Sequence, residues 1–442
     1  MIGIFFYFEI YFMKQLEKGN KKLLNAWAFY DWANSVYSLV ITSSIFPLYF
    51  GFLFTKENPN IILFGTSIKA TALISFVTAF AFLSVAILSP ILSGIADYLG
   101  NKKRFMQFFC YLGAFSCIGL YWFSKENVVW GIFCFYFGLL GFWGSLVYYN
   151  SYLADIAYNE QHDKLSAKGF SLGYVGSVVL LLICLKFILS KSGNEALEAM
   201  KISFVLTGIW WLVFSQYTFY YLPKGNKNNN PINVSIFFNG FKELKKVQLL
   251  FFKDLVLKRF LFAFFVYSMA VQTVMLVATY FGEQEINWEN SEQKTKGLIV
   301  SILVIQLVAV VGAIITSKLA SKFGNIKTLI GINSIWIFIC VGAFFVTEPF
   351  QFYAVAAIVG LVMGGIQSLS RSTFSKLIPE TKDTTSFFSF YDVAEKIGIV
   401  IGMLIYGFID QITGSMRNAI LFLVLFFIAG VLLLYRTLKV QK

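Results

Sequence analysis

The sequence is poor in charge and almost without histidine. Of its 442 residues only 13% are charged, and His162 is the one histidine. A soluble domain carries roughly a quarter charged residues, so most of this surface is not built for water. A lone histidine excludes an H-E-x-x-H motif and any multi-histidine metal site. No G-x-x-x-x-G-K-[ST] string occurs, so ATP does not act through a P-loop here.

Cysteine is also scarce and unpaired. The five cysteines lie inside apolar runs and form no C-x-x-C pair, which is typical of small apolar residues and not of metal ligands or disulfides (Cys110, Cys117, Cys134, Cys184 and Cys340). The string GFSLG at Gly169 matches a nucleophile elbow, but it opens an apolar helix and the histidine lies in the preceding loop. We therefore predict no enzyme activity, no cofactor and no metal.

Long apolar runs are what the sequence has in abundance. It is 58% hydrophobic and 19% aromatic, with a mean hydropathy of +0.71. Twelve runs reach the ~20 residues that cross a bilayer as a helix, at 31–54, 69–95, 104–124, 128–153, 168–190, 201–222, 258–281, 296–320, 327–346, 350–375, 386–409 and 417–436. The fold class is an all-α membrane protein. The net charge of +13 does not indicate nucleic acid, because the basic residues are scattered between these runs.

One long polar connection, PKGNKNNNPINVS from Pro223, divides the runs into six plus six. We expect a tail at 1–24, a six-helix bundle at 25–222, a central loop at 223–257 and a second bundle at 258–442. Lys and Arg favour the loops on one side, which places both termini in the cytoplasm. Within the loop, FKELKKVQLLFFKDLVLKRF is either a basic amphipathic helix on the anionic leaflet or a simple tether. Translation starts at Met1 or at Met13.

Three weak matches indicate that the two halves are repeats. DYLGNKKRF from Asp97 aligns with SKFGNIKTL from Ser321, NSYLADI from Asn150 with RSTFSKL from Arg371, and GFSLGY with FFSFYD. The matches occur in the same order, each about half a chain apart. Parallel repeats of this kind are a known transporter plan, with the substrate site at mid-membrane between the halves.

The loop GIADYLGNKKR resembles the loop between helices 2 and 3 of the major facilitator superfamily. Gly94, Asp97, Gly100, Lys102 and Lys103 match its pattern, whereas Tyr98 and Asn101 replace basic residues. The resemblance implies the twelve-helix major facilitator fold.

Three further stretches narrow this resemblance: AFYDWANSVYS from Ala28, GGIQSLSRSTFSKLIPE from Gly364 and FFSFYDVAEK from Phe387. Together they are similar to the vacuolar amino-acid effluxers of autophagy and their bacterial relatives. Ala154 and Glu395 depart from that family's pattern. The resemblance implies a membrane transporter, with amino acids as substrates of the vacuolar members.

Three charged residues fall at one cytoplasmic depth of the predicted helices. Asp31 opens the first run, Arg371 precedes the end of the tenth, and Asp392 lies two turns into the eleventh. Ionised groups at this depth are costly unless paired or wet, and one guanidinium can serve two carboxylates. We hypothesise a gate cluster of Asp31, Arg371 and Asp392. The alternative is that each residue snorkels or caps its own helix.

Deeper in the eleventh run, Asp392 and Lys396 can pair at i, i+4, which leaves Glu395 without a partner. A carboxyl desolvated near mid-membrane is a candidate proton carrier; the alternative is a salt bridge to a basic residue elsewhere. Polar residues on helices expected to line the cavity are substrate candidates or ordinary interhelical hydrogen bonds (Asn34, Tyr37, Asn150, Gln272, Gln306 and Gln367).

Three functions remain open from the sequence. The first is a secondary transporter of a small organic solute, with amino acids and proton coupling as options. The second is a non-transporting receptor or scaffold, and the third a lysolipid flippase. We expect a monomer whose partners are the substrate and the lipid bilayer, in a bacterial cytoplasmic membrane.

Overall fold

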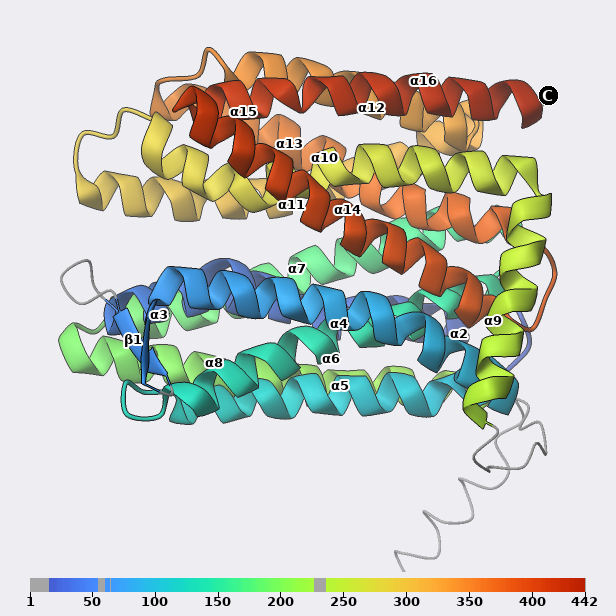
Figure 1. Ribbon diagram of the computed structural model, residues 1–442, viewed down its shortest axis with the longest axis horizontal. Helices are drawn as coiled ribbons and strands as arrows, with labels where there is room; N and C mark the ends of the chain where they lie inside the picture. Colours follow the sequence, from blue (N-terminus) through green and yellow to red (C-terminus); the bar gives the residue numbers. More distant parts are fainter. Residues whose placement is uncertain (1–15, 55–59, 64, 226–235, 442) are drawn as a thin grey trace, which may run out of the picture.

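The computed structural model describes residues 16–54, 60–63, 65–225 and 236–441. Residues 1–15 of the predicted tail, with both candidate start sites, and residues 226–235 of the central loop lie outside this range. Helices account for nearly all of the described chain (Figure 1).

The first half contains six membrane-crossing helices. The first crossing combines α2 (Lys21–Val36), a π-helical segment (Tyr37–Ile45) and α3 (Phe46–Leu53). A hairpin of β1 (Asn60–Leu63) and β2 (Thr66–Lys69) follows, antiparallel with Asn60 opposite Lys69. The remaining crossings are α4 (Ala70–Leu99), α5 (Lys102–Gly119), α6 (Val128–Ile156), α7 (His162–Leu189) and α8 (Gly193–Tyr221).

The second half follows the amphipathic helix α9 (Ile236–Lys253). Its crossings are α10 (Leu255–Glu285), α11 (Ser291–Phe323), α12 (Asn325–Ala343), α13 (Pro349–Leu377) and α14 (Thr384–Thr413), and finally α15 (Met416–Phe422) with α16 (Val424–Gln441). Eleven crossings among the described residues are long and apolar enough by composition. The twelfth is α14, whose interior carries Asp392, Glu395 and Lys396. The expected twelve-helix fold is confirmed.

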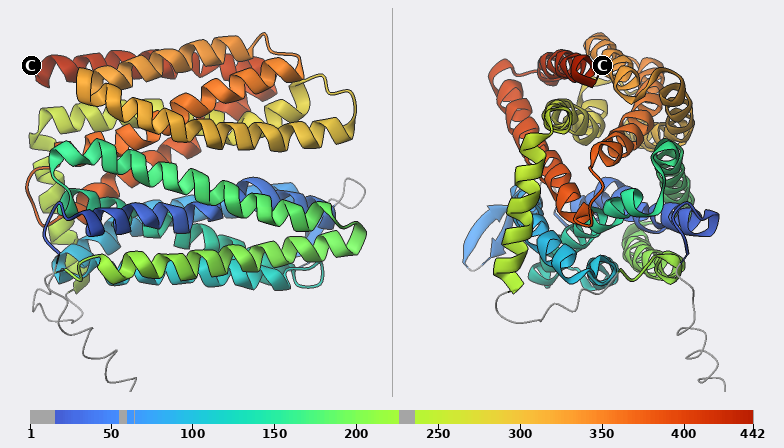
Figure 2. Two further views of the ribbon diagram at one scale, coloured as in Figure 1. Left: turned by 180° about the vertical axis from the view of Figure 1, so that it is seen from behind. Right: turned by 90° about the vertical axis from the view of Figure 1, so that its right-hand side faces the viewer.

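Each half has its own hydrophobic core. One core is built from residues between Leu23 and Leu222. The other is built mainly from residues between Val247 and Leu434, and it also includes Tyr174 of the first half. Large apolar side chains such as Phe76, Phe338 and Leu404 point outward and are at least 67% exposed, as expected where the surrounding solvent is lipid. The halves therefore form two layers, which Figure 1 and Figure 2 show from three sides.

Glycine allows the closest helix approaches. A Cβ on Gly360 or Gly364 of α13 would collide with the α11 backbone at Ile305 or Ala309. Such small-residue spacing is how membrane helices approach each other without a hydrophobic driving force.

The first crossing starts ten residues earlier than predicted, at Lys21 and not at Asp31. The apolar run missed this start because the two lysines and Asn25 interrupt it, yet the Asn20 side chain caps the helix by accepting from the Lys22 amide. Asp31 thus lies about 15 Å into the helix at 1.5 Å per residue. The interpretation of Asp31 as a helix-end carboxylate is wrong, because the dipole effect fades within the first turn.

Candidate functional site

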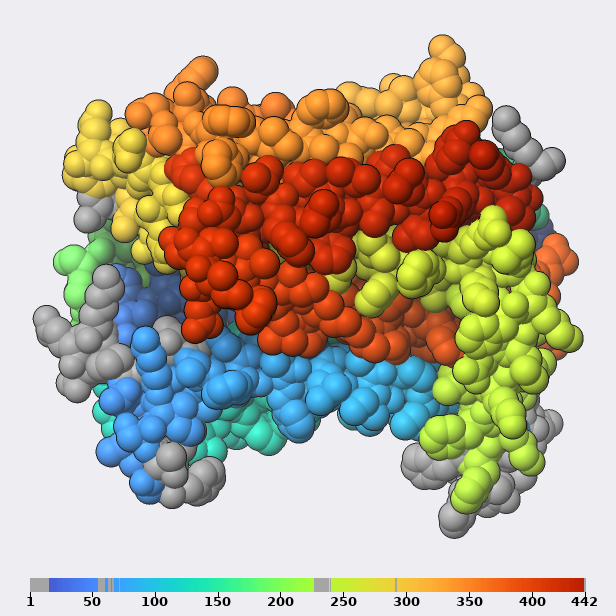
Figure 3. All heavy atoms as spheres, turned by 45° about the horizontal axis from the view of Figure 1, so that its top comes forward, coloured from blue at the N-terminus to red at the C-terminus, as the bar shows by residue number. Residues whose placement is uncertain are grey.

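Hydrogen bonds and ion pairs between the two halves gather at one end of the bundle. This is the end at which α9 lies, here called the α9 end (Figure 1, right). It contains the ends of α4, α6 and α13 and the beginnings of α5, α7 and α14. The two layers are in contact along α4 and α14, seen side by side in Figure 3. Ser151 of α6 lies 3.5 Å from Thr385 of α14, and Ser166 of α7 donates to the Ser368 carbonyl.

Asp31 of α2 and Arg371 of α13 form a buried ion pair across the halves. Both side chains are at most 5% exposed, and the nearest atoms, Arg371 Nη2 and Asp31 Oδ2, lie 3.2 Å apart. The guanidinium makes five hydrogen bonds in all, which also reach Asn150 Oδ1 and the side chain and carbonyl of Ser166. The Tyr149 hydroxyl donates to the same Asp31 oxygen at 2.8 Å. Each charge is therefore paired and hydrogen-bonded, which its burial requires.

Aromatic rings and one glycine complete the surroundings of this pair. The Arg371 guanidinium carbon lies 4.1 Å from the Phe170 ring centre and 4.9 Å from that of Trp27. Gly169 provides the space: a Cβ there would lie 2.5 Å from Asp31 Oδ2 and 3.1 Å from Arg371 Nη2. The GFSLG string is thus a feature of helix packing around an ion pair, a role that no sequence pattern indicated.

Asp392 does not join Arg371, which corrects the three-member cluster expected from the sequence. It pairs instead with Lys396 one turn along α14, at 3.0 Å. The same Lys396 ammonium lies 2.7 Å from Glu395. A lysine four residues away is a nearer partner than an arginine on another helix, and it satisfies both carboxylates.

Glu395 therefore has partners, contrary to the expectation that it lacks one. Besides Lys396, it accepts a hydrogen bond from Gln272 Nε2 of α10 at 2.9 Å. The cluster of Asp392, Glu395 and Lys396, here called the α14 triad, also contacts the first half. Asp392 accepts a hydrogen bond from the Ser89 hydroxyl of α4 at 3.2 Å. The Lys396 ammonium lies 3.7 Å from the ring centre of Trp143 on α6.

The end of α4 and the beginning of α5 bind the beginning of α14. Asp97 accepts from both the amide and the hydroxyl of Ser386 at 2.7 Å, in the first turn of α14. A carboxylate is favoured there because the first amides of a helix lack partners and carry partial positive charge. Gly100 ends α4 in the left-handed region with φ of 62°. Lys102 pairs with Asp155 of α6 and donates to Thr384 at 3.0 Å.

Two other members of the loop motif, Lys103 and Gly94, make contacts outside α14. Lys103 donates to the Leu222 carbonyl at 2.7 Å and so stays inside the first half. Gly94 meets Gly240 of α9 so closely that a Cβ would collide with the Gly240 carbonyl.

At the edge of the same end, Lys246 of α9 pairs with Asp383 at 2.8 Å. The hydrogen bond to Asp383 raises the pKa of Lys246.

The second half repeats this arrangement with residues that sequence reasoning missed. Asn325, the counterpart of Asn101 in the GN alignment, donates to Asp163 at the beginning of α7 at 2.8 Å. Lys376 of α13 pairs with the same carboxylate. Residues at or next to each GN pair therefore contact the first turn of a helix in the opposite half. The aligned GN pairs were the signal that pointed to this symmetry.

The six substrate-cavity candidates divide by location. Gln272 meets Glu395, and Asn150 belongs to the Arg371 network. Gln367 accepts from the Tyr174 hydroxyl at 2.7 Å and so joins the halves. Gln306 is half-buried on α11, and the buried Asn34 accepts from Ser35. Tyr37 lies inside the first core, stacked on Phe142 with ring centres 5.1 Å apart, which excludes it as a cavity-lining residue in this state.

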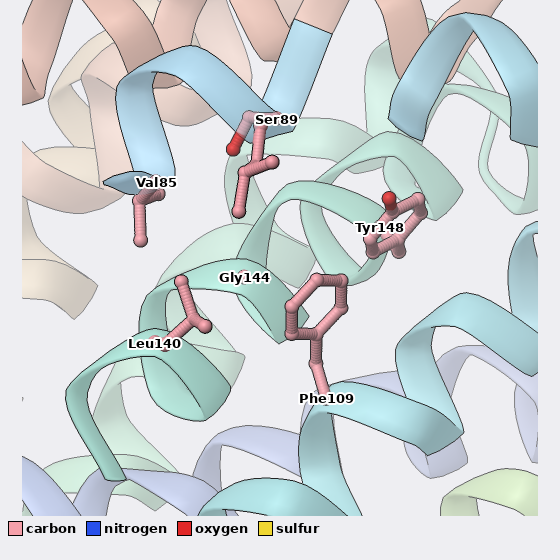
Figure 4. A pocket seen from close by; sticks show the side chains of 7 residues that line it. Val85, Ser89, Phe109, Leu140, Gly144 and Tyr148 are labelled. Carbon is pink, nitrogen blue, oxygen red and sulfur yellow. The ribbon is translucent and has the colours of Figure 1, made fainter. Parts of the chain in front are cut away.

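A small cavity lies beside this interface, between α4, α5 and α6. Its walls include Ser89, Phe109, Leu140 and Tyr148 (Figure 4). Its volume of about 10 Å³ is roughly what one water molecule needs, and far below that of an organic solute.

Comparisons with known proteins point to one family. The family described as "Vacuole effluxer Atg22 like" matches residues 19–442. An uncharacterised MFS-type transporter, YxiO of Bacillus subtilis, is 31% identical over 421 residues, which cover 93% of each chain. Autophagy-related protein 22 of Yarrowia lipolytica is 24% identical over 61% of this chain and 49% of its own length. This chain thus spans about half of that relative.

Two solved structures share the fold at low sequence identity. The human organic anion transporter MFSD10 superposes with a TM-score of 0.68 at 10% identity, over 94% of this chain and 99% of that one. The proton:xylose symporter XylE superposes with a TM-score of 0.65 at 13% identity, over 94% and 95% of the two chains.

Proposed function

This chain belongs to the Atg22-like family of the major facilitator superfamily, and on that premise we propose that it is a secondary transporter of a small organic solute. Such transporters rock two halves around a central site and open to one side at a time. The observation that carries the proposal is the concentration of polar contacts between the halves at the α9 end. An interface of this kind can be made in one state and broken in another.

In this proposal the Asp31–Arg371 pair is a gate. The excess of Lys and Arg on one side assigns the α9 end to the cytoplasm, so the described state is closed toward the cytoplasm. When the halves part, water replaces the lost contacts around the guanidinium, whose five hydrogen bonds all end on the first half. The gate is weakened when either charge is left buried without its partner.

The proposed substrates are amino acids, bound near the α14 triad. The triad and Gln272 offer carboxylates, an ammonium and an amide, groups that complement a zwitterion. Two carboxylates share one ammonium in the triad, so one negative charge remains and a proton is the simplest ion to balance it. We therefore include proton coupling in the proposal, together with a monomeric state and a bacterial cytoplasmic membrane.

Transport by the purified protein in liposomes tests this function. We expect saturable flux of labelled amino acids that responds to an imposed pH gradient and is abolished by Arg371→Gln. Flux that does not change with the imposed pH gradient refutes proton coupling and leaves the proposal of transport intact. Flux of lysolipids without amino acids indicates a flippase, and the absence of flux across a broad solute panel indicates a receptor.

A further inference from the structure

Helix α9 lies across the α9 end and packs on both halves from outside. Its axis runs across the membrane-crossing helices, at the level where α5 and α10 begin (Figure 1; Figure 2, right). On the first half, Gly240 packs directly against Gly94 of α4. On the second half the Phe251 ring stacks on Phe390 of α14, with ring centres 5.9 Å apart. Val247, on the same face, is fully buried.

The opposite face of α9 exposes large apolar side chains. Each is at least 51% exposed, and the four share one side of the helix (Phe238, Phe241, Leu249 and Phe252). We call this set the α9 outer face. Single exposed apolar residues are ordinary on a soluble surface, whereas several large ones on one side of a helix are typical of an interaction surface.

Lysines lie within and beside the outer face. The helix carries four lysines against one glutamate, a net charge of +3. Three of the lysines are exposed and absent from the salt bridges of the described residues, and we call them the α9 lysines (Lys242, Lys245 and Lys253). The fourth, Lys246, makes the bond to Asp383. Exposed apolar side chains interspersed with lysines, on a helix that lies across the ends of the membrane-crossing helices, complement an anionic lipid surface.

The contacts of α9 also connect it to the closed state. Gly240 fixes the helix to α4 of the first half, while Lys246 and Phe251 fix it to the beginning of α14 in the second. These two attachments lie on parts that must move relative to each other when the α9 end opens. A helix held firmly in the membrane surface therefore favours the closed arrangement.

We propose that α9 binds anionic phospholipids of the surrounding membrane through the α9 lysines and the outer face, and that this binding stabilises the state closed at the α9 end. The inference concerns lipid control of the conformation, and it holds whatever solute is carried.

The first measurement is the lipid contact of α9. A fluorophore on Gln248→Cys, exposed beside the outer face, reports the polarity around the helix in nanodiscs. The discs contain phosphatidylcholine alone or mixed with phosphatidylglycerol. We expect a blue shift with phosphatidylglycerol that is lost when the three α9 lysines are changed to glutamine. A matched control changes three exposed lysines at the other end of the bundle and keeps the shift (Lys125, Lys186 and Lys191).

The second measurement is the closure of the α9 end. Ser151 is buried at the interface of the halves, so the rate at which a maleimide labels the Ser151→Cys variant reports opening. We expect phosphatidylglycerol to slow the labelling several-fold in the parent and in the control, but not in the variant without α9 lysines. If the fluorescence blue shift is absent, or if it persists when the α9 lysines are changed, the proposed lipid site is wrong. A shift without slower labelling overturns the link to closure.

Discussion

The buried pair of Asp31 and Arg371 makes a quantitative prediction about the α9 end. Asp31→Asn removes the negative charge and leaves the guanidinium, 4% exposed, without a counter-ion. Breaking a buried pair in this way costs about 3–5 kcal/mol. The cost falls on the closed state, because opening lets water reach the guanidinium. A cost of about 3 kcal/mol changes the ratio of closed to open molecules by roughly 150-fold.

The assay is the labelling rate of Ser151→Cys in nanodiscs, with the five native cysteines replaced by alanine. We expect Asp31→Asn to speed labelling at least tenfold by this reasoning. Adding Arg371→Gln removes the unpaired charge and returns the rate toward that of the parent. Ser190→Cys, exposed at the other end of the bundle, is the control and labels at one rate throughout. If the two single effects simply multiply in the double variant, the pair does not hold this end closed.

Three further predictions follow from the same interface. Gly169→Ala puts a Cβ 2.5 Å from the paired carboxylate and speeds labelling of the Ser151→Cys variant as charge removal does, whereas Gly331→Ala, with nothing within 4 Å, leaves the rate unchanged. Asp97→Asn weakens the contact with the first turn of α14 by about 1 kcal/mol, which raises the labelling rate about fivefold; an unchanged rate contradicts this role. Lys396→Met leaves two carboxylates without a cation and lowers the thermal unfolding temperature, and adding Glu395→Gln restores part of the loss. No recovery would show that the triad is not coupled.

Much of the fold was predictable from sequence because it depends on composition and length alone. A run of about 20 apolar residues must lie in lipid as a helix, since its backbone groups have no other partners there. The twelve crossings follow from this rule, although α2 begins at Lys21, earlier than the apolar run indicates. The family resemblance was likewise local, carried by short strings such as FYDWANSVYS.

The candidate site was predictable only in part. Asp31 and Arg371 could be identified as candidates because charged residues are rare inside apolar runs and need a partner there. The sequence offered Asp392 two partners, a lysine on the same helix and an arginine on another. In the structure Asp392 pairs with Lys396, and Glu395 pairs with the same Lys396 ammonium.

Residue order alone predicts a twelve-helix membrane protein with two similar halves, because apolar runs and matching strings can be read directly from it. The pairing of the charges, in contrast, depends on how the helices pack. Gly169 and Asp163 matter because helices from opposite halves approach them. Those approaches depend on how two bundles are docked, and pairing between distant residues is fixed by that docking and not by any local pattern.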